Sequence, residues 1–284
     1  MVKTVFRCAP LTCKFFCACR TPMADLHSRR YDTRTTTFSP EGRLYQVEYA
    51  MEAINHAAMC IGLKCKDGIL IGVENRTVHP LLDPLAGSEK IYKLNDNIAC
   101  SVAGITSDAN TLVGILRLQA ARYELQNKEA IPVQQLVEHV ANHKQFFTQI
   151  GGKRPFGVSM LYMGWDERHD YQMYMSDPSG NFTGWKGICI GANSQAAMSL
   201  LNQEYDPSAD LKTMTKFCVK VLAKTLDVKI SAEKIELMSL QRVDDKTVMK
   251  KLRKEDLAAL ISEYEELEKA KEAALLLQQQ MKKS

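Results

Sequence analysis

The sequence predicts an α+β fold in four layers, in which two β-sheets lie face to face and a pair of helices covers each outer side. Strand patterns and helix patterns come in groups along the chain, which argues against a doubly wound parallel sheet. The order is two β-hairpins, two helices, three strands, two helices, one strand and a final helix. With 284 residues and 45% apolar content, the chain is long enough for one large domain or two small ones.

The first predicted helix spans residues 39–54. Ser39 is a suitable N-cap because its hydroxyl can accept an orphan backbone N–H, and Pro40 suits the first turn, where no N–H is needed. Apolar residues then recur at helical spacing, at Leu44, Val47, Met51 and Ile54. Two apolar runs follow, at 58–66 and 68–74, and the polar turn between them predicts the first β-hairpin.

The remaining elements follow from the same periodicities, with Gly, Pro, Asn and Asp at the breaks. A second hairpin is predicted to join residues 90–94 to residues 98–103. The other predicted helices lie at 106–127, 132–149, 193–205 and 211–227, and the other predicted strands lie at 156–165, 170–176, 182–191 and near 234–242.

Residues 251–284 form a separate charged segment, which predicts a long C-terminal helix starting near residue 254. The segment is rich in helix formers and in acidic residues. Its apolar stripe is thin and consists of Leu257, Ile261, Tyr264 and Leu267. This pattern is typical of a solvated helix that runs past the domain. A helix that docks on a partner is the alternative.

Residues 1–27 differ from the rest of the chain, because they are basic, hold no acid before Asp25 and contain four cysteines. We expect this extension to be disordered, or to precede a translation start at Met23. A targeting peptide and a metal or acylation site are the alternatives. The cysteines of the extension are Cys8, Cys13, Cys17 and Cys19.

The cysteine count as a whole indicates a reducing compartment. The chain has nine cysteines with uneven spacing, which argues against a disulfide framework. Most of those outside the extension sit within apolar runs and are expected to be small core residues. These are Cys60, Cys100, Cys189 and Cys218.

Several functional classes find no support in the composition or the motifs. The net charge is +4 without a long basic block, so a nucleic-acid partner is not indicated, and no apolar run is long enough for a membrane span. The serine-hydrolase motif GxSxG, the P-loop and the zinc motif HExxH are absent. His139 and His143 have the spacing of one helical turn but lack a third ligand, so we expect neither a metal site nor a cofactor.

One stretch of the sequence indicates a particular protein family more specifically than the composition and the motifs above. Tyr31, Asp32 and Arg34 form the motif YDxR, and the sequence FSPEGRLYQVEYA follows. Together they resemble the N-terminal signature of the α-type subunits of the 20S proteasome. The resemblance covers residues 28–250 and implies the four-layer αββα sandwich of the N-terminal-nucleophile (Ntn) hydrolases. Further supporting stretches lie at 88–110, 151–166 and 176–186.

The β-type subunits of this family are Ntn hydrolases, in which an N-terminal threonine is the nucleophile and its α-amine is the base. Laying the first hairpin over theirs at Gly62 places their acid at Glu74, their lysine at Lys90 and their nucleophile at Ala58. Alanine has no hydroxyl, and cleavage before Ala58 would remove the signature helix. The nearest nucleophile, Cys60, is expected to face inward. The resemblance therefore implies a non-catalytic subunit of a threonine-type endopeptidase complex.

The α-type subunits form seven-membered rings whose N-terminal segments converge over the axial pore and close it. By position, the resemblance assigns a role in the cluster that holds the open gate to Tyr31, Asp32, Arg34, Pro40 and Tyr49. Tyrosine hydroxyls and the carboxylate can hydrogen-bond between neighbouring subunits, and proline fixes the direction in which the chain enters.

The resemblance also assigns Lys90 to a pocket between adjacent α subunits and Gly104 to the wall of that pocket. An ammonium there can pair with the C-terminal carboxylate of an activator tail. The implied partners are the other α subunits of a heteroheptameric ring, the β-ring subunits, and the tails of regulatory-particle ATPases or other activators. Helix 39–54 is expected to pack against the β ring and the neighbouring α subunit, and neither nucleic acid nor a membrane is expected.

The sequence therefore predicts a non-catalytic structural and gating subunit of the 20S core, which supports ubiquitin-dependent protein degradation in the cytoplasm and the nucleus. One rival hypothesis is that the chain is an active Ntn hydrolase, and Ala58 argues against it because alanine has no hydroxyl. The other is a free-standing adaptor or duplicate copy that does not enter the ring. About 27 residues precede the familiar start near Ser28, and an extension of this length would crowd the pore mouth or project outward.

Overall fold

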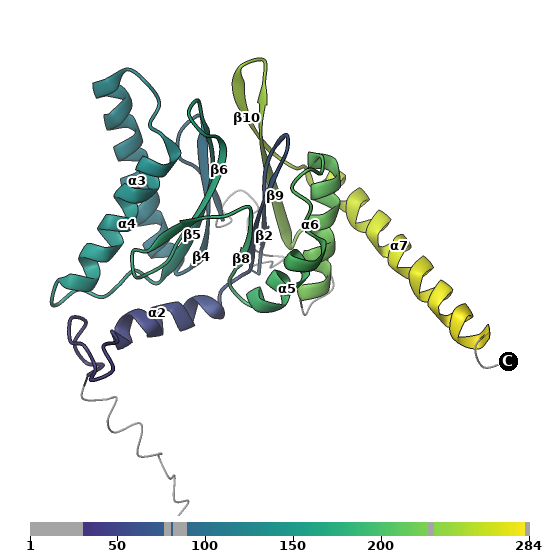
Figure 1. The fold of residues 1–284 in the computed structure, drawn as a ribbon, viewed down its shortest axis with the longest axis horizontal. Coiled ribbons are helices and arrows are strands. Elements are labelled where there is room, and N and C mark those ends of the chain that lie inside the picture. Colours follow the sequence, from purple (N-terminus) through teal and green to yellow (C-terminus); the bar gives the residue numbers. More distant parts are fainter. Residues whose placement is uncertain (1–30, 77–80, 82–89, 227–229, 282–284) are drawn as a thin grey trace, which may run out of the picture.

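The computed structural model describes residues 31–76, 81, 90–226 and 230–281, and Figure 1 shows two β-sheets between layers of helices. The first sheet has the order β10-β9-β2-β1-β8, and all of its paired strands are antiparallel. Its strands are β1 (Cys60–Cys65), β2 (Gly68–Glu74), β8 (Gly187–Ile190), β9 (Ile235–Val243) and β10 (Lys246–Lys251).

The second sheet has the order β3-β4-β5-β6-β7 and is likewise antiparallel throughout. Each predicted hairpin contributes to one sheet, so the first hairpin builds the first sheet and the second hairpin builds the second. The strands are β3 (Ile91–Lys93), β4 (Ile98–Gly104), β5 (Val158–Asp166), β6 (Asp170–Ser176) and β7 (Phe182–Gly184).

Helices cover the two outer faces of the sandwich, as the grouping of elements predicts. α3 (Thr106–Asn127) and α4 (Val133–Gln149) cover the second sheet, while α5 (Ser194–Glu204) and α6 (Leu211–Thr225) cover the first sheet. The four-layer α+β sandwich is thereby confirmed.

Three apolar clusters fill the spaces between the layers. Leu116 of α3 lies in the cluster under the second sheet, Leu222 of α6 in the cluster under the first sheet, and Leu161 of β5 in the cluster between the sheets. The cysteines expected in the core are all buried and free of disulfides: Cys60, Cys100, Cys189 and Cys218. Burial of the two inner faces and the two helix layers is the main force that holds this architecture together.

α2 (Tyr45–Asn55) lies across one open end of the sandwich, beneath the ends of the strands in Figure 1. Its Val47 and Ile54 are buried, and Ile54 joins the apolar cluster between the sheets. The helix therefore closes the end at which β1 begins.

The predicted start of this helix at Ser39 is wrong. Residues 39–43 form a separate turn, in which Gly42 N donates to Ser39 O and Ser39 N donates to Arg43 O, both at 2.9 Å. Gly42 has φ +78°, in the left-handed region that glycine adopts without a steric penalty and that a helix excludes. The Ser39 hydroxyl accepts from Arg43 N at 3.2 Å and so closes this turn; α2 begins after Leu44 without a side-chain cap.

The predicted strand at 182–191 is in fact two strands in different sheets. Trp185 N donates to Met173 O of the second sheet at 2.9 Å, while Lys64 N of the first sheet donates to Lys186 O at 2.8 Å. The chain thus crosses between the sheets at residues 185–186, which the continuous strand-like pattern conceals.

β10 was not predicted, because its sequence KTVMKK was assigned in part to the charged C-terminal segment. It pairs with β9 through a two-residue turn at Asp244 and Asp245, whose φ values of 47° and 60° are both left-handed. Such turns match the twist of the flanking strands, although Asn-Gly is their commoner sequence. β10 is an edge strand, which explains its lysines.

α7 (Lys254–Met281) is the predicted charged helix, and it leaves the sandwich beside α6 in Figure 1. The first part of its thin stripe is packed, since Leu257 and Ile261 are buried in the cluster that α6 shares. Lys216 of α6 also forms an ion pair with Glu263 at 2.7 Å. Leu267 is 56% exposed, so docking on the domain ends near this residue.

Two further points concern the limits of the fold. The extension at residues 1–27, with its cysteines, lies outside the described residues. In the part of the chain that the structure describes, no helix has both the length and the apolar character needed to cross a membrane.

Candidate functional site

The end of the sandwich closed by α2 carries the positions that correspond to a hydrolase site. Ala58 lies just before β1 and is 5% exposed, so a methyl group stands at the nucleophile position. Glu74, at the acid position, ends β2. Its carboxylate accepts hydrogen bonds from Met59 N at 3.0 Å and from Arg76 Nε at 3.0 Å. The acid therefore serves the backbone and an arginine at a place where an enzyme would use it for chemistry.

Cys60 is buried between the sheets, as the sequence predicts, and its thiol donates to Val102 O at 3.3 Å. Burial raises the pKa of this thiol to about 12, although the positive charge of Lys90 and a hydrogen bond with Ser101 act in the opposite direction. The thiol is therefore protonated at neutral pH and inaccessible. A nucleophilic role for Cys60 is excluded on both grounds.

The N-terminal segment is joined to α2 through Asp32. Tyr49 Oη donates to Asp32 Oδ2 at 3.3 Å, and Gln46 Nε2 donates to the backbone oxygen of Asp32 at 2.5 Å. Partial desolvation and the Asp32 carboxylate raise the pKa of the Tyr49 phenol, so it remains a donor at neutral pH. Tyr45 stacks beside Tyr49 with ring centroids 6.2 Å apart.

The structure thus brings together two of the residues assigned to the gate, Asp32 and Tyr49. Tyr31 is half-buried in the same segment, Pro40 lies exposed in the turn before α2, and Arg34 is exposed. Gln46 was not singled out from the sequence. Its position one helical turn before Tyr49, on the same face of α2, was the available signal.

Lys90, directly before β3, and Gly104, the last residue of the neighbouring β4, lie at this same end. Val102 N donates to Lys90 O at 3.2 Å, and Lys90 is half-buried. Gly104 has φ +130°, and a Cβ atom there would stand 2.1 Å from Gly157 O. The site therefore requires glycine at position 104.

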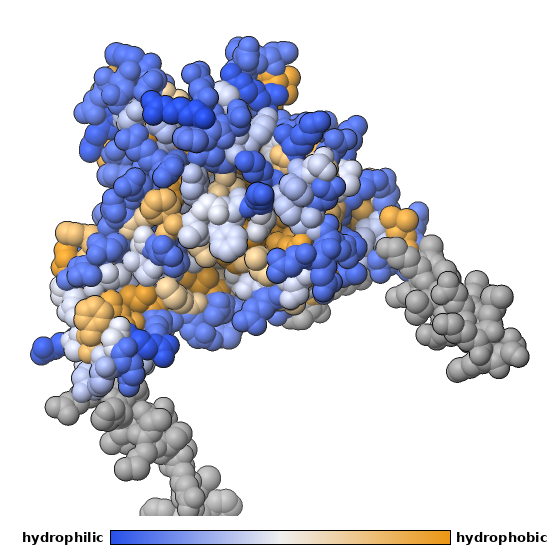
Figure 2. Space-filling model, in the orientation of Figure 1, coloured by the Kyte–Doolittle hydropathy of each residue, from blue (hydrophilic) through white to orange (hydrophobic). Residues whose placement is uncertain are grey.

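Exposed apolar side chains mark two surfaces. Figure 2 shows apolar surface along α2 and beneath the adjoining strands. Phe38, Tyr49 and Ile105 belong to this end of the molecule and are 61%, 46% and 42% exposed. On α3, Leu118 and Leu125 are 59% and 71% exposed. Apolar exposure of this extent is typical of surfaces that contact other subunits.

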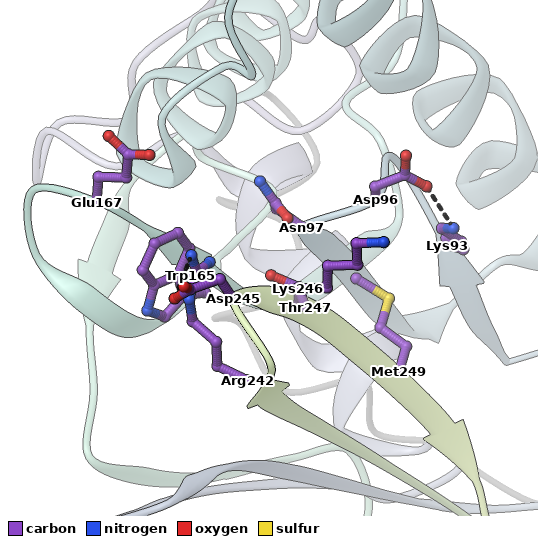
Figure 3. A pocket seen from close by; sticks show the side chains of 10 residues that line it. All are labelled: Lys93, Asp96, Asn97, Trp165, Glu167, Arg242, Asp245, Lys246, Thr247 and Met249. Carbon is purple, nitrogen blue, oxygen red and sulfur yellow. Dashed lines mark hydrogen bonds and ion pairs between the residues drawn. The ribbon is translucent and has the colours of Figure 1, made fainter.

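A cleft of about 470 Å³ occupies the opposite end of the sandwich, where the β3–β4, β5–β6 and β9–β10 turns meet. Figure 3 shows the Arg242 guanidinium against the Trp165 ring, 3.6 Å from its centroid, and Lys93 paired with Asp96 at 2.7 Å. Basic and acidic side chains line the cleft in equal number, and its edge is formed by β10. The sequence did not predict this cleft.

No metal centre is present among the residues that the structure describes, since no three His, Cys, Asp or Glu side chains converge there. Of the pair His139 and His143, only His139 is exposed. The ring of His143 instead packs against Phe147 and Phe156, with centroids 5.1 and 5.7 Å away, and burial lowers its pKa.

Two family models match the chain. One, described as proteasome subunit, covers residues 54–240, and the other, described as the N-terminal signature of the A-type proteasome subunits, covers residues 31–53. The chain belongs to the proteasome subunit family. Together the two matches span residues 31–240, which contain the segment with Asp32, α2 and most of the sandwich, whereas β10 and α7 lie beyond them.

Curated relatives agree with this assignment. The chain is similar to the alpha type-4 proteasome subunit of Drosophila melanogaster, with 56% identity over 252 residues, which are 87% of this chain and 96% of the relative. It is similar to the alpha type-4-A subunit of Arabidopsis thaliana, with 51% identity over 222 residues, 78% of this chain and 89% of the relative. The alpha type-4 subunit of Spinacia oleracea is 52% identical over 211 residues, 74% of this chain and 84% of the relative.

As an α-type proteasome subunit of the 20S core, the chain is a non-catalytic member of a threonine protease complex. The geometry explains why it does not catalyse. Ala58 has no hydroxyl that could act as a nucleophile. Because α2 precedes Ala58 in the chain, Ala58 has no free α-amine that could act as a base, and the Glu74 carboxylate is already hydrogen-bonded to Met59 N and Arg76 Nε. Membership of the family also implies assembly with other proteasome subunits.

Proposed function

We propose that the chain is a structural and gating subunit of the α ring, which supports ubiquitin-dependent degradation by the threonine proteases of the β ring. The observation that carries the gating role is the hydrogen bond from Tyr49 Oη to Asp32 Oδ2. It ties the N-terminal segment to a helix that is itself packed on the sandwich. A segment held in this way can be directed away from or toward a pore.

The scaffold role is supported by the two apolar surfaces. Leu118 and Leu125 on the outer face of α3 suit a contact with a β-ring subunit, and the α2 end suits a contact with the neighbouring α subunit. In a closed ring each subunit uses two different surfaces for its two neighbours, because the contacts are heterologous.

Lys90 and Gly104 are proposed to form part of a pocket for the C-terminal tails of ATPases of the regulatory particle or of other activators. Lys90 carries the charge that pairs with a terminal carboxylate, and Gly104 permits close approach of the backbone. The cytoplasm and the nucleus are the proposed locations, in line with the reducing environment that the nine cysteines indicate.

The gating role is tested by removing one oxygen. Core particles that contain a tagged Tyr49→Phe chain are purified, and hydrolysis of a small fluorogenic peptide is measured with and without an activator. Because a hydrogen bond at a partly exposed site contributes about 1 kcal/mol, stimulation by the activator should fall by about threefold to fivefold. Tyr123→Phe is the matched control, since Tyr123 Oη of α3 donates to Glu129, two residues beyond the end of that helix, at 3.1 Å and away from α2.

Equal stimulation in Tyr49→Phe and wild type would contradict the gating role. The free-standing adaptor is the second candidate, and the projection of α7 beyond Leu267 favours it. An adaptor would be found near the size of a single chain, whereas a ring subunit is found in assemblies with peptidase activity.

A further inference from the structure

The link between α2 and β1, residues 56–59, is held by hydrogen bonds at two places: the end of β2, through Glu74 and Arg76, and the segment that follows β8, through Ala192. His56 O accepts from Arg76 Nη1 at 2.7 Å, and Ala57 O accepts from Ala192 N at 2.9 Å. Met59 N donates to the Glu74 carboxylate at 3.0 Å, while Met59 O accepts from Glu74 N at 2.8 Å. A short loop that is bound at this many points has little freedom to tilt.

Glu74 and Arg76 are the centre of this arrangement. Arg76 Nε donates to one carboxylate oxygen and Arg76 Nη1 to His56 O, so a single guanidinium spans from the end of β2 to the end of α2. The Glu74 side chain is 13% exposed and the Arg76 side chain is 44% exposed. Hydrogen bonds to charged groups in partly buried surroundings are stronger than neutral ones.

The guanidinium binds α2 at its C-terminal end, where backbone oxygens lack helical partners. Cations are favoured at this end because the helix dipole makes it negative. The last turn of α2 has no basic residue of its own. Arg76, two residues beyond the end of β2, supplies that charge, and it therefore fixes the position of the helix end as well as satisfying its carbonyl group.

α2 connects this point to the gate segment. The helix has 11 residues and is about 16 Å long at 1.5 Å per residue. Near its other end, Gln46 and Tyr49 hold Asp32. A tilt of about 10° at the Arg76 end would displace the far end of such a helix by about 3 Å, which exceeds the tolerance of a hydrogen bond.

We propose that Glu74 and Arg76 form a brace that sets the angle of α2 and, through it, the position of the N-terminal segment. Glu74 lies at the position that the resemblance gives to the acid of the Ntn hydrolases, and here its carboxylate serves as a positioning residue for the gate. The inference rests on the proposed gating function, and it adds the residues that regulate it from outside the gate cluster.

The test uses purified core particles that contain the tagged full chain as wild type, Arg76→Gln, Glu74→Gln or Lys216→Gln. Lys216 is the matched control because it forms an ion pair with Glu263 between α6 and α7, far from α2. Hydrogen exchange is followed for the amides of residues 45–59, and peptidase activity is measured without an activator and after mild detergent.

In Arg76→Gln and Glu74→Gln, amide exchange in residues 45–59 should rise by about tenfold, as expected for the loss of one charged hydrogen bond. The ratio of activity without activator to activity after detergent should change by at least twofold in the same particles. Lys216→Gln should leave both quantities as in wild type, and the strands of both sheets should keep their protection in every variant.

Unchanged exchange in residues 45–59 would overturn the brace. Increased exchange with an unchanged activity ratio would overturn its connection to the gate. If Arg76→Gln fails to enter the particle, Arg76→Lys is used for the test. Lysine can pair with Glu74 but has no planar fork with which to bridge to His56 O, so amide exchange in residues 45–59 should lie between wild type and a full loss of the contact. A wild-type chain that never enters a particle refutes the proposed function, whereas the exchange measurement on the free full chain still decides the brace.

Discussion

The two ends of the sandwich differ in whether the space between the sheets is covered. At one end, α2 covers the gap between the sheets, and the side chains of Glu74 and Arg76 are hydrogen-bonded to the backbone of residues 56–59. At the other end, Arg242 of β9 packs on Trp165 of the second sheet, and a cleft lies beside this contact along the β9–β10 hairpin. An Ntn hydrolase must keep the first end open to admit substrate, and this chain has closed it.

The comparison shows that this chain has the fold without a working catalytic site. Glu74, which the resemblance places at the acid position, accepts hydrogen bonds from Met59 N and Arg76 Nε. The nucleophile position holds the methyl group of Ala58, which fits a buried site. Closure by α2 therefore adds stability at the first end, while the second end retains exposed charged and aromatic groups. The following predictions test this difference.

The largest effect is expected at Gly104, at the closed end. Gly104→Ala places a Cβ atom 2.1 Å from Gly157 O at φ +130°, so β4 and β5 must separate locally. The free energy of unfolding should fall by about 3 kcal/mol, the upper range for forced unfavourable backbone conformations. Chemical denaturation of the purified chain measures this.

Gly114→Ala is the control for that substitution, because it adds a methyl group on an exposed position of α3 with nothing within 4 Å. It should raise stability by up to about 1 kcal/mol, since alanine is the better helix former. Similar losses in both variants would mean that the close approach at Gly104 has relaxed.

A second prediction concerns the apolar contact that closes the first end. Ile54→Ala removes a side chain that is 4% exposed between α2 and the two sheets, and it should cost about 3 kcal/mol. Met249→Ala at the open end removes a partly buried side chain and should cost about 1 kcal/mol. If the two losses measured by denaturation are equal, the ends do not differ in packing.

A smaller effect is expected for Arg242, which holds the open end through Trp165. Arg242→Gln should lower the free energy of unfolding by about 1 kcal/mol, the usual contribution of a partly desolvated cation–π contact. The fluorescence of Trp165 should shift to the red as its ring becomes hydrated. Arg253→Gln, which alters an exposed arginine before α7, should leave the spectrum unchanged.

The smallest effect is a pH dependence at Asp108, near the closed end. Hydrogen bonds from Arg154 hold the pKa of Asp108 below its usual value, opposed in part by burial. The carboxylate therefore contributes stability above its unfolded pKa of about 3.9, and this contribution is lost as pH falls through the lower folded value.

Since the Arg154 side chain is 58% exposed and solvent screens its charge, although the Asp108 side chain is only 12% exposed, the Asp108 contribution should not exceed about 1 kcal/mol. The free energy of unfolding of Asp108→Asn should accordingly decrease less than that of wild type as the pH is lowered from about 4 to about 2. If the stability of Asp108→Asn falls at low pH as steeply as that of wild type, the Asp108 charge does not stabilise the fold through Arg154.

Much of the fold could be predicted from the sequence, because its strands and helices are long, strongly periodic and grouped. Residues 68–74 and 98–103, for example, are apolar runs that became central strands buried on both faces. β10 escaped prediction because an edge strand needs lysines where a central strand needs apolar residues. The start of α2 was missed because Gly42 breaks the helix after a convincing N-cap.

The candidate site was predictable where one residue type decides the chemistry. Ala58 excludes a hydroxyl nucleophile whatever its surroundings, and the N-terminal signature pointed to Asp32 and Tyr49. Contacts between residues distant in sequence were not predictable. Arg76 reaches His56 because β2 and the end of α2 meet in space, and Arg242 reaches Trp165 because two turns converge from different sheets.

The central claim is that this chain acts inside a ring and not as an enzyme or adaptor on its own. The most direct measurement is sedimentation of cell extract on a glycerol gradient, with the C-terminally tagged chain and peptidase activity followed in every fraction. We predict that the tagged chain sediments with the peptidase activity of the core particle. A tagged chain that remains near 32.0 kDa, apart from that activity, would contradict the account.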